Sequence, residues 1–266
     1  MEQIQNNRVI TDLYRENAQF PGIALDGSDV YLCWQRFVDR HDSLMASCRR
    51  GDEVVWEREI SDGGEVLHPV ILAHGGAIWY AWSEYARENW RILARCYRDG
   101  QWGEVLTVAS GEALFFPRLF TWQGRLHIIW TEQHKGSAAA VLCPLTEAGP
   151  GAAETVSAVG EAYRAGAAEG GDGNLYVAYD GFDGKQYKLF ARARTAAGWS
   201  KEIVVSQGED WASTPWIAAK PDGAVVGWYD YGYMAVYSVR SADLTVRDGA
   251  LAAVNPQCLK LSLIHI

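Results

Sequence analysis

Hydrophobic and polar residues alternate over short stretches of this chain, and turns that contain glycine separate the stretches. Runs such as Val30–Trp34, Ile78–Trp82 and Leu126–Trp130 are rich in β-branched and aromatic residues. Alternation with a period of two is typical of β-strands, and no stretch shows the 3.6-residue period of a helix. The pattern predicts an all-β protein built from short antiparallel strands.

The predicted strands recur in a repeat of about 48 residues. Pro21, Pro69 and Pro117 are each 48 residues apart, and Pro215 follows after two further repeats. The aromatic residue that ends the second strand of each unit keeps this spacing, at Trp34, Trp82, Trp130, Tyr179 and Trp228. Each unit holds four short strands, like one blade of a β-propeller, whereas a β-sandwich would not repeat its turns at a fixed period. We therefore predict a single β-propeller domain over residues 1–260.

The repeat predicts five blades, at about residues 21–68, 69–116, 117–164, 165–214 and 215–257. Val9–Asp12 aligns with the fourth strand of a repeat, so residues 1–20 are expected to supply the outer strand of a closing blade. The last six residues, Leu261–Ile266, resemble the translation of a common sequencing adapter and are expected to be an artefactual tail. Together these features predict a truncated ring of six or more blades. A complete ring of five blades is the alternative.

The charge of the chain limits the classes of partner. The formal net charge is −9, and no cluster of Lys or Arg occurs. Nucleic acids and anionic membrane surfaces require such a cluster, so we expect neither as a partner. No apolar stretch is long enough to span a bilayer, and the N-terminus does not resemble a signal peptide. We expect a cytoplasmic protein, and a secreted one if the N-terminus is truncated.

The cysteines and histidines do not indicate a metal or a disulfide framework. The five cysteines include no CxxC pair, and Cys48, Cys96 and Cys143 fall at one position of successive repeats. Equivalent positions in neighbouring blades lie too far apart for a disulfide, so we expect buried free thiols. The six histidines lack metal-ligand spacing, and neither a phosphate-binding loop nor a nucleophile elbow is present. We expect no metal and no cofactor.

Acidic residues follow the second strand of most repeats. In a propeller, these positions and the loops that enter each blade share one face around the central channel, where a pocket is expected. A pair of carboxylates about 5–10 Å apart could cleave a glycosidic bond. Capping of tight turns is the structural alternative. The candidate catalytic residues are Glu84, Glu132, Asp180 and Asp230.

Residues that interrupt the repeat, and aromatic or basic residues of the same loops, are candidates for substrate binding. Arg36 replaces the acid in the first blade, while Arg118 and Trp216 follow a proline where the first two blades have Gly22 and Val70. Arginine can bind a carboxylate or sulfate, and aromatic rings offer flat apolar faces with a polar edge. The candidates are Arg36, His68, Tyr85, Trp90, Arg118, Trp211 and Trp216.

The repeat resembles the BNR-type repeats of the sialidase superfamily over residues 9–257. The resemblance rests on Pro-x-Ile-Ala-x-Asp-Gly-x-x-Val-Tyr-x-x-Trp at 21–34 and on Asp99-Gly100-Gln101-Trp102, a degenerate aspartate box without its serine. Sialidases carry their first catalytic arginine in a Phe-Arg-Ile-Pro motif. Phe116-Pro117-Arg118-Leu119 has these elements in another order, so the catalytic arginines are not assigned here. The resemblance implies a propeller that recognises or processes glycans.

Two functions follow from these observations. The first is a sialidase-like propeller that recognises or processes glycans, with a glycoside hydrolase-like activity if it is an enzyme. The second is a non-catalytic lectin or protein-interaction propeller. A lectin repeats its sugar-contacting residues in every blade, whereas an enzyme concentrates unlike residues at the centre. In either case the expected partner is a glycan or another small polar ligand.

Overall fold

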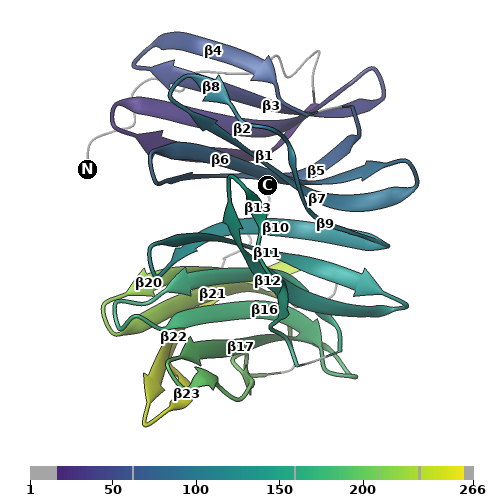
Figure 1. Cartoon of the computed structure of the whole chain (residues 1–266). Coiled ribbons are helices and arrows are strands. Elements are labelled where there is room, and N and C mark those ends of the chain that lie inside the picture. The colour runs from purple at the N-terminus through teal and green to yellow at the C-terminus, as the bar shows by residue number, and fades with distance from the viewer. Residues whose placement is uncertain (1–16, 62, 159, 209, 233–234, 261–266) are drawn as a thin grey trace.

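Five antiparallel β-sheets make up the described part of the chain, which Figure 1 shows as a computed structural model. The structure describes residues 17–260 except 62, 159, 209, 233 and 234. No helix occurs among these residues, and so none that is long and apolar enough to cross a membrane. The prediction of an all-β β-propeller with four-stranded blades is confirmed.

The strands follow one another across each sheet in chain order, and the fourth strand is divided into two short pieces in three of the sheets. The first sheet consists of β1 (Asn17–Asp26), β2 (Asp29–Val38), β3 (His41–Arg50) and β4 (Glu53–Glu59). The second consists of β5 (Glu65–His74), β6 (Ala77–Ala86), β7 (Asn89–Arg98), β8 (Gln101–Trp102) and β9 (Leu106–Gly111). The third consists of β10 (Ala113–Trp122), β11 (Arg125–His134), β12 (Ser137–Thr146), β13 (Gly149–Pro150) and β14 (Glu154–Thr155). The fourth consists of β15 (Ala162–Glu169), β16 (Leu175–Phe182), β17 (Tyr187–Thr195), β18 (Gly198–Trp199) and β19 (Ile203–Val204). The fifth consists of β20 (Trp211–Lys220), β21 (Gly223–Gly232), β22 (Ala235–Arg247) and β23 (Ala250–Lys260).

The hydrophobic core lies in layers between consecutive sheets. Four clusters of buried residues are present, and each combines residues from two successive sheets. Trp82, Trp130, Tyr179 and Trp228 occupy one cluster each, on the side of their sheet that faces the preceding sheet. The aromatic residue that marks the repeat in the sequence is therefore the large side chain that joins one blade to the previous one.

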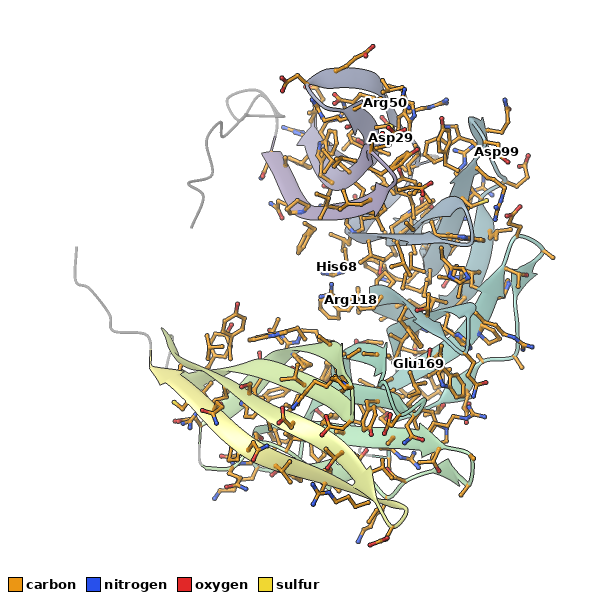
Figure 2. The ribbon with its side chains drawn as sticks, turned by 90° about the vertical axis from the view of Figure 1, so that its left-hand side faces the viewer. Asp29, Arg50, His68, Asp99, Arg118 and Glu169 are labelled. Carbon is orange, nitrogen blue, oxygen red and sulfur yellow. The ribbon has the colours of Figure 1, made fainter. Side chains whose placement is uncertain are left out.

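The five sheets form an arc, with the first and the fifth sheet at its two ends (Figure 2). In the second sheet, Ile71 and Ala73 pack against the core of the first sheet. Ile23 and Leu25 hold the same positions in the first sheet, and each is 64% exposed. The end face of the first sheet is thus uncovered in the described residues. The closing strand expected at residues 9–12 and the tail at 261–266 lie outside them, so the number of blades in the ring stays a prediction.

The blade boundaries predicted from the prolines lie too late in the chain. Each first strand carries a β-bulge, and in four of the five sheets a proline is its second residue. Proline has no N–H, so it suits the unpaired position of a bulge inside a strand. The first strand begins upstream, at Asn17 instead of Pro21 and at Glu65 instead of Pro69. Residues 17–20, expected in an outer strand, are therefore part of β1.

The thiols allow a direct test of this core. Cys33, Cys48, Cys96 and Cys143 are buried and free, and Cys258 is exposed. Burial raises the pKa of Cys33 to about 12 and that of Cys143 to about 11, so their reactive thiolate forms are scarce at neutral pH. We expect one thiol of the native protein to react rapidly with a disulfide reagent, and five after unfolding in urea. Rapid reaction of two or more native thiols would contradict this packing.

Candidate functional site

The β-bulges place one residue of each first strand at a special backbone conformation. Phe20, His68, Phe116, Arg164 and Thr214 precede the proline or alanine of the bulge, and all five have positive φ, between 41° and 55°. Such values are costly for residues other than glycine, and a bulge redirects the side chain that carries it. The rings of Phe20 and His68 lie 5.0 Å apart, and those of His68 and Phe116 lie 4.2 Å apart. The bulges of three consecutive sheets thus bring their side chains together.

A pocket of about 370 Å³ lies beside His68 and Phe116 and reaches the bulge residue of the fourth sheet, Arg164. The second sheet contributes one lining residue, and the third and fourth sheets contribute three each. Most of the lining residues are aromatic and the others can form hydrogen bonds, as in many binding sites for small polar ligands. They are His68, Phe115, Phe116, Gln133, Tyr163, Arg164 and Tyr187.

Further aromatic rings extend the pocket on both sides. Trp90 lies 4.6 Å from Phe115 between ring centroids, and Tyr85 lies 5.3 Å from Trp90. On the other side, Trp211 lies 5.8 Å from Tyr187 and is 54% exposed. The result is an aromatic surface that runs across the second to the fifth sheet on one face of the propeller.

The polar groups of the pocket are oriented by their own partners. Arg164 donates two hydrogen bonds to Asp180, from Nε at 3.1 Å and from Nη2. Asp180 is fully buried, so desolvation raises its pKa, and the hydrogen bonds from Arg164 oppose this shift. The guanidinium has five N–H groups and the Arg164 side chain is 34% exposed, so N–H donors remain for a ligand. Asp180 therefore positions Arg164 in the pocket.

His68 is a neutral group in this pocket at physiological pH. Burial between aromatic rings lowers the pKa of His68 to about 4, and the positive charge of Arg118 acts in the same direction. Figure 2 shows the two side chains next to each other on the inner side of the arc. A neutral imidazole offers one donor and one acceptor to a ligand.

Two of the predicted catalytic acids form internal contacts. Trp82 donates from Nε1 to Glu84 at 3.3 Å, and Arg91 forms an ion pair with the same carboxylate. Trp228 donates to Asp230 at 2.8 Å, and Arg240 lies 2.6 Å from it. Both carboxylates are buried. These contacts favour the structural alternative for the two acids, and their catalytic role stays a prediction.

Asp180 does not belong to the same series as the other three acids. It follows Tyr179 directly, whereas Glu84 follows Trp82 by two residues. Neighbouring residues of a strand point to opposite faces, so Asp180 lies on the other face of its sheet. The strand pairing shows the same offset of one residue. Glu84 pairs with Val66 in the second sheet, and its counterpart in the fourth sheet is Gly181, which pairs with Ala162. The expected ring of four equivalent carboxylates is therefore not formed.

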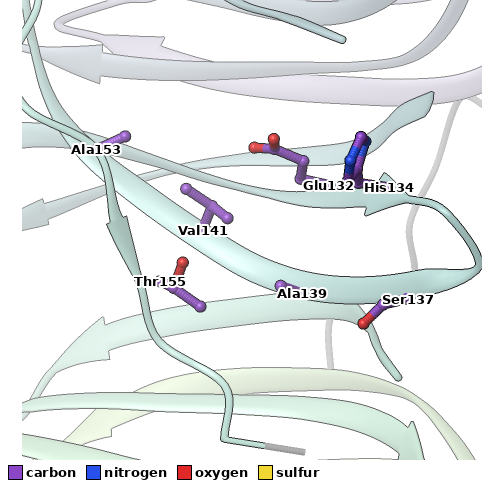
Figure 3. A pocket seen from close by; sticks show the side chains of 7 residues that line it. All are labelled: Glu132, His134, Ser137, Ala139, Val141, Ala153 and Thr155. Carbon is purple, nitrogen blue, oxygen red and sulfur yellow. The ribbon is translucent and has the colours of Figure 1, made fainter. Parts of the chain in front are cut away.

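Glu132 is the predicted acid without an internal partner. It is partly exposed, and no hydrogen bond or ion pair joins its carboxylate to another described residue. It lines a second pocket, of about 410 Å³, whose lining residues all come from the third blade (Figure 3). None of the described residues that line the aromatic pocket is acidic. The structure thus separates Glu132 from the aromatic pocket.

The predicted binding residues divide into two groups. His68 lines the aromatic pocket, Tyr85, Trp90 and Trp211 extend it, and Arg118 lies beside His68. By contrast, Arg36 pairs with Glu59 at 3.2 Å in the first sheet. Trp216 packs over Gly227 and lies 5.3 Å from Tyr229 in the fifth sheet. These two residues lie outside the pocket.

Several lining residues were not among the predicted candidates. They are Phe115, Phe116, Gln133, Tyr163, Arg164 and Tyr187. The bulge residues had a signal in the sequence, since each occupies the position before the repeated proline or its alanine replacement. Tyr187 had none, because only the pairing of β16 with β17 brings it beside Phe182 and Tyr163.

Comparison with known proteins supports the fold. Searches of protein-family models and of curated proteins give no match to the sequence. Among solved structures, a GH43 endo-arabinanase from Bacillus licheniformis is 14% identical with a TM-score of 0.50, over 87% of this chain and 95% of that chain. An α-L-arabinofuranosidase from Lactobacillus brevis is 10% identical with a TM-score of 0.51, over 88% and 93%. A puromycin-hydrolyzing peptidase from Mycobacterium tuberculosis is 16% identical with a TM-score of 0.57, over 93% of this chain and 38% of that chain. At such identities the likeness shows a β-propeller and does not single out the sialidase type.

The contrast between Glu84 and Glu132 predicts different effects of one substitution. Glu84→Gln removes the charge that Arg91 and Trp82 contact, and should lower the free energy of unfolding by about 2–4 kcal/mol. Glu132→Gln removes a partly exposed charge that has no partner, and should change the free energy of unfolding by less than about 0.5 kcal/mol. Urea denaturation of both variants measures the difference. Equal effects would show that the Glu84 contacts do not stabilise the fold.

Proposed function

We propose that this propeller binds a glycan in the aromatic pocket where the bulges of the second, third and fourth sheets meet. The proposal rests on this pocket, because it combines aromatic walls with oriented hydrogen-bonding groups. A sugar ring has an apolar face of C–H groups and an edge of hydroxyls. Such a ring fits a site that offers flat rings together with a few fixed polar groups.

Each part of the pocket matches one part of a sugar. Phe116 and Tyr187 provide rings on which the apolar face can stack. Arg164, held by Asp180, provides N–H donors for hydroxyl oxygens, and neutral His68 can donate or accept. Tyr85, Trp90 and Trp211 continue the aromatic surface beyond the pocket. This extension suits an oligosaccharide better than a single sugar.

The acid contacts support recognition over cleavage at this site. Hydrolysis of a glycosidic bond commonly requires two carboxyl groups beside the bond. The described residues that line the aromatic pocket include no carboxylate, and Asp180 beneath it is tied to Arg164. The endo-arabinanase and the α-L-arabinofuranosidase among the similar structures support sugar as the class of ligand. Sialidase-like cleavage and a cytoplasmic location remain predictions from the sequence.

A lectin with one equivalent site per blade is less well supported. The aromatic pocket draws on unlike residues of three sheets, and the five bulge positions hold four different types of residue. The sugar-contacting residues of such a lectin would repeat. The proposed site is therefore a single central one.

Two tryptophans of β20 provide a matched test of the proposal. A glycan array identifies the oligosaccharide that binds best, and calorimetry measures its affinity for each variant. Trp211→Ala, next to Tyr187, and Phe116→Ala should each weaken binding at least about tenfold, as expected for aromatic contacts at the centre of a site. Trp216→Ala, which removes a tryptophan of similar exposure outside the pocket, should leave the affinity unchanged.

The opposite results are equally clear. Binding that is lost in Trp216→Ala and retained in Phe116→Ala would place the ligand away from the pocket. Absence of binding to every glycan on the array would contradict glycan recognition itself.

A further inference from the structure

Equivalent pockets occur at the same place in the second and third sheets. The pocket beside the second sheet, of about 700 Å³, is lined by Leu93, Val105 and Thr107, among other residues. The pocket beside the third sheet is lined by their counterparts one repeat later, Val141, Ala153 and Thr155. The two sites therefore have the same backbone frame and can be compared residue by residue.

The comparison shows one difference in charge. In the second sheet, Glu84 lies directly opposite Arg91 across the strand pair, and the two form an ion pair. In the third sheet, Glu132 lies opposite Ala139. The acid at this position is thus neutralised within the chain in the second sheet, where Glu84 is fully buried, and lacks its arginine in the third.

A second difference frees the carboxylate further. Trp82 donates a hydrogen bond to Glu84, but Nε1 of Trp130 is buried and has no hydrogen-bond partner. Glu132 instead extends over Val141 into the pocket, as Figure 3 shows. Leaving a buried donor unpaired is costly, so the sequence of this blade gives up stability that its neighbour retains.

We propose that the pocket of Glu132 binds a guanidinium group on an aliphatic arm, which takes the place that Arg91 fills in the second sheet. Ala139, Val141 and Ala153 offer an apolar side for the arm, and a guanidinium can bind the carboxylate through two parallel hydrogen bonds. The hydroxyls of Ser137 and Thr155 can accept further N–H groups. This site is separate from the aromatic pocket, and the proposal does not depend on glycan binding.

The charged neighbours of the site are compatible with a cation. His134 lines the pocket, and its Nδ1 lies 2.9 Å from a carboxylate oxygen of Glu112. No lysine or arginine is among the described lining residues. A cationic ligand therefore meets one unpaired carboxylate and one imidazole that already has an acidic partner.

A variant that copies the second sheet tests the proposal. Ala139→Arg introduces the arginine of the second sheet opposite Glu132, so the variant should fold and should fill the site from within. Two probes test the source of the guanidinium: agmatine as a free small molecule, and acetyl-Gly-Arg-Gly-amide as a peptide. Acetyl-Gly-citrulline-Gly-amide is the neutral isostere. Binding is measured by NMR titration of the full chain, and thermal melting confirms that each variant is folded.

We expect the wild-type protein to bind at least one guanidinium probe with at least tenfold higher affinity than it binds the citrulline peptide. Ala139→Arg and Glu132→Gln should each weaken this binding at least tenfold. Stronger binding of agmatine would identify a free ligand, and stronger binding of the peptide would identify a protein side chain. Equal affinities of the wild type and Ala139→Arg, or no preference for arginine over citrulline, would overturn the proposal. If Ala139→Arg does not fold, unchanged binding in Glu132→Gln alone overturns it.

Discussion

The β-bulge in the first strand of every sheet is the constraint on which the rest of the site depends. It holds a residue other than glycine at positive φ in all five sheets, at a cost of about 1–3 kcal/mol each. Such a conformation persists only where the surrounding packing fixes it, and here the layers between consecutive sheets do so. Because the bulge lies at one point of each inner strand, the side chains of His68 and Phe116 meet.

Equivalent backbone positions hold side chains of different chemistry from one blade to the next. Arg91 neutralises Glu84 in the second sheet, whereas Ala139 leaves Glu132 free in the third. The bulge position holds an imidazole in the second sheet, a phenyl ring in the third and a guanidinium in the fourth. The repeat thus stabilises the propeller, and departures from the repeat create its pockets. The aromatic residues that keep the period are buried, whereas His68, Phe116 and Arg164, which differ from blade to blade, line the aromatic pocket.

The sequence predicts the architecture well because large buried aromatic residues recur at a fixed spacing. Trp82 and Trp130 mark the packing between blades directly. The prolines were harder to interpret, since a proline is equally compatible with a strand start and with the unpaired position of a bulge. The site was predicted only in part. Gln133 and Tyr187 come together only because the third and fourth sheets pack against each other. The acids were also hard to align, since Asp180 follows its marker aromatic residue by one position and Glu84 follows its own by two.

A crystal structure of the full chain with its best-binding oligosaccharide would show whether the aromatic pocket binds the sugar. We expect a sugar ring stacked on Phe116 or Tyr187, with a hydroxyl oxygen within hydrogen-bond distance of Arg164. A sugar bound only at the outer edge of one sheet, with the aromatic pocket empty, would contradict it.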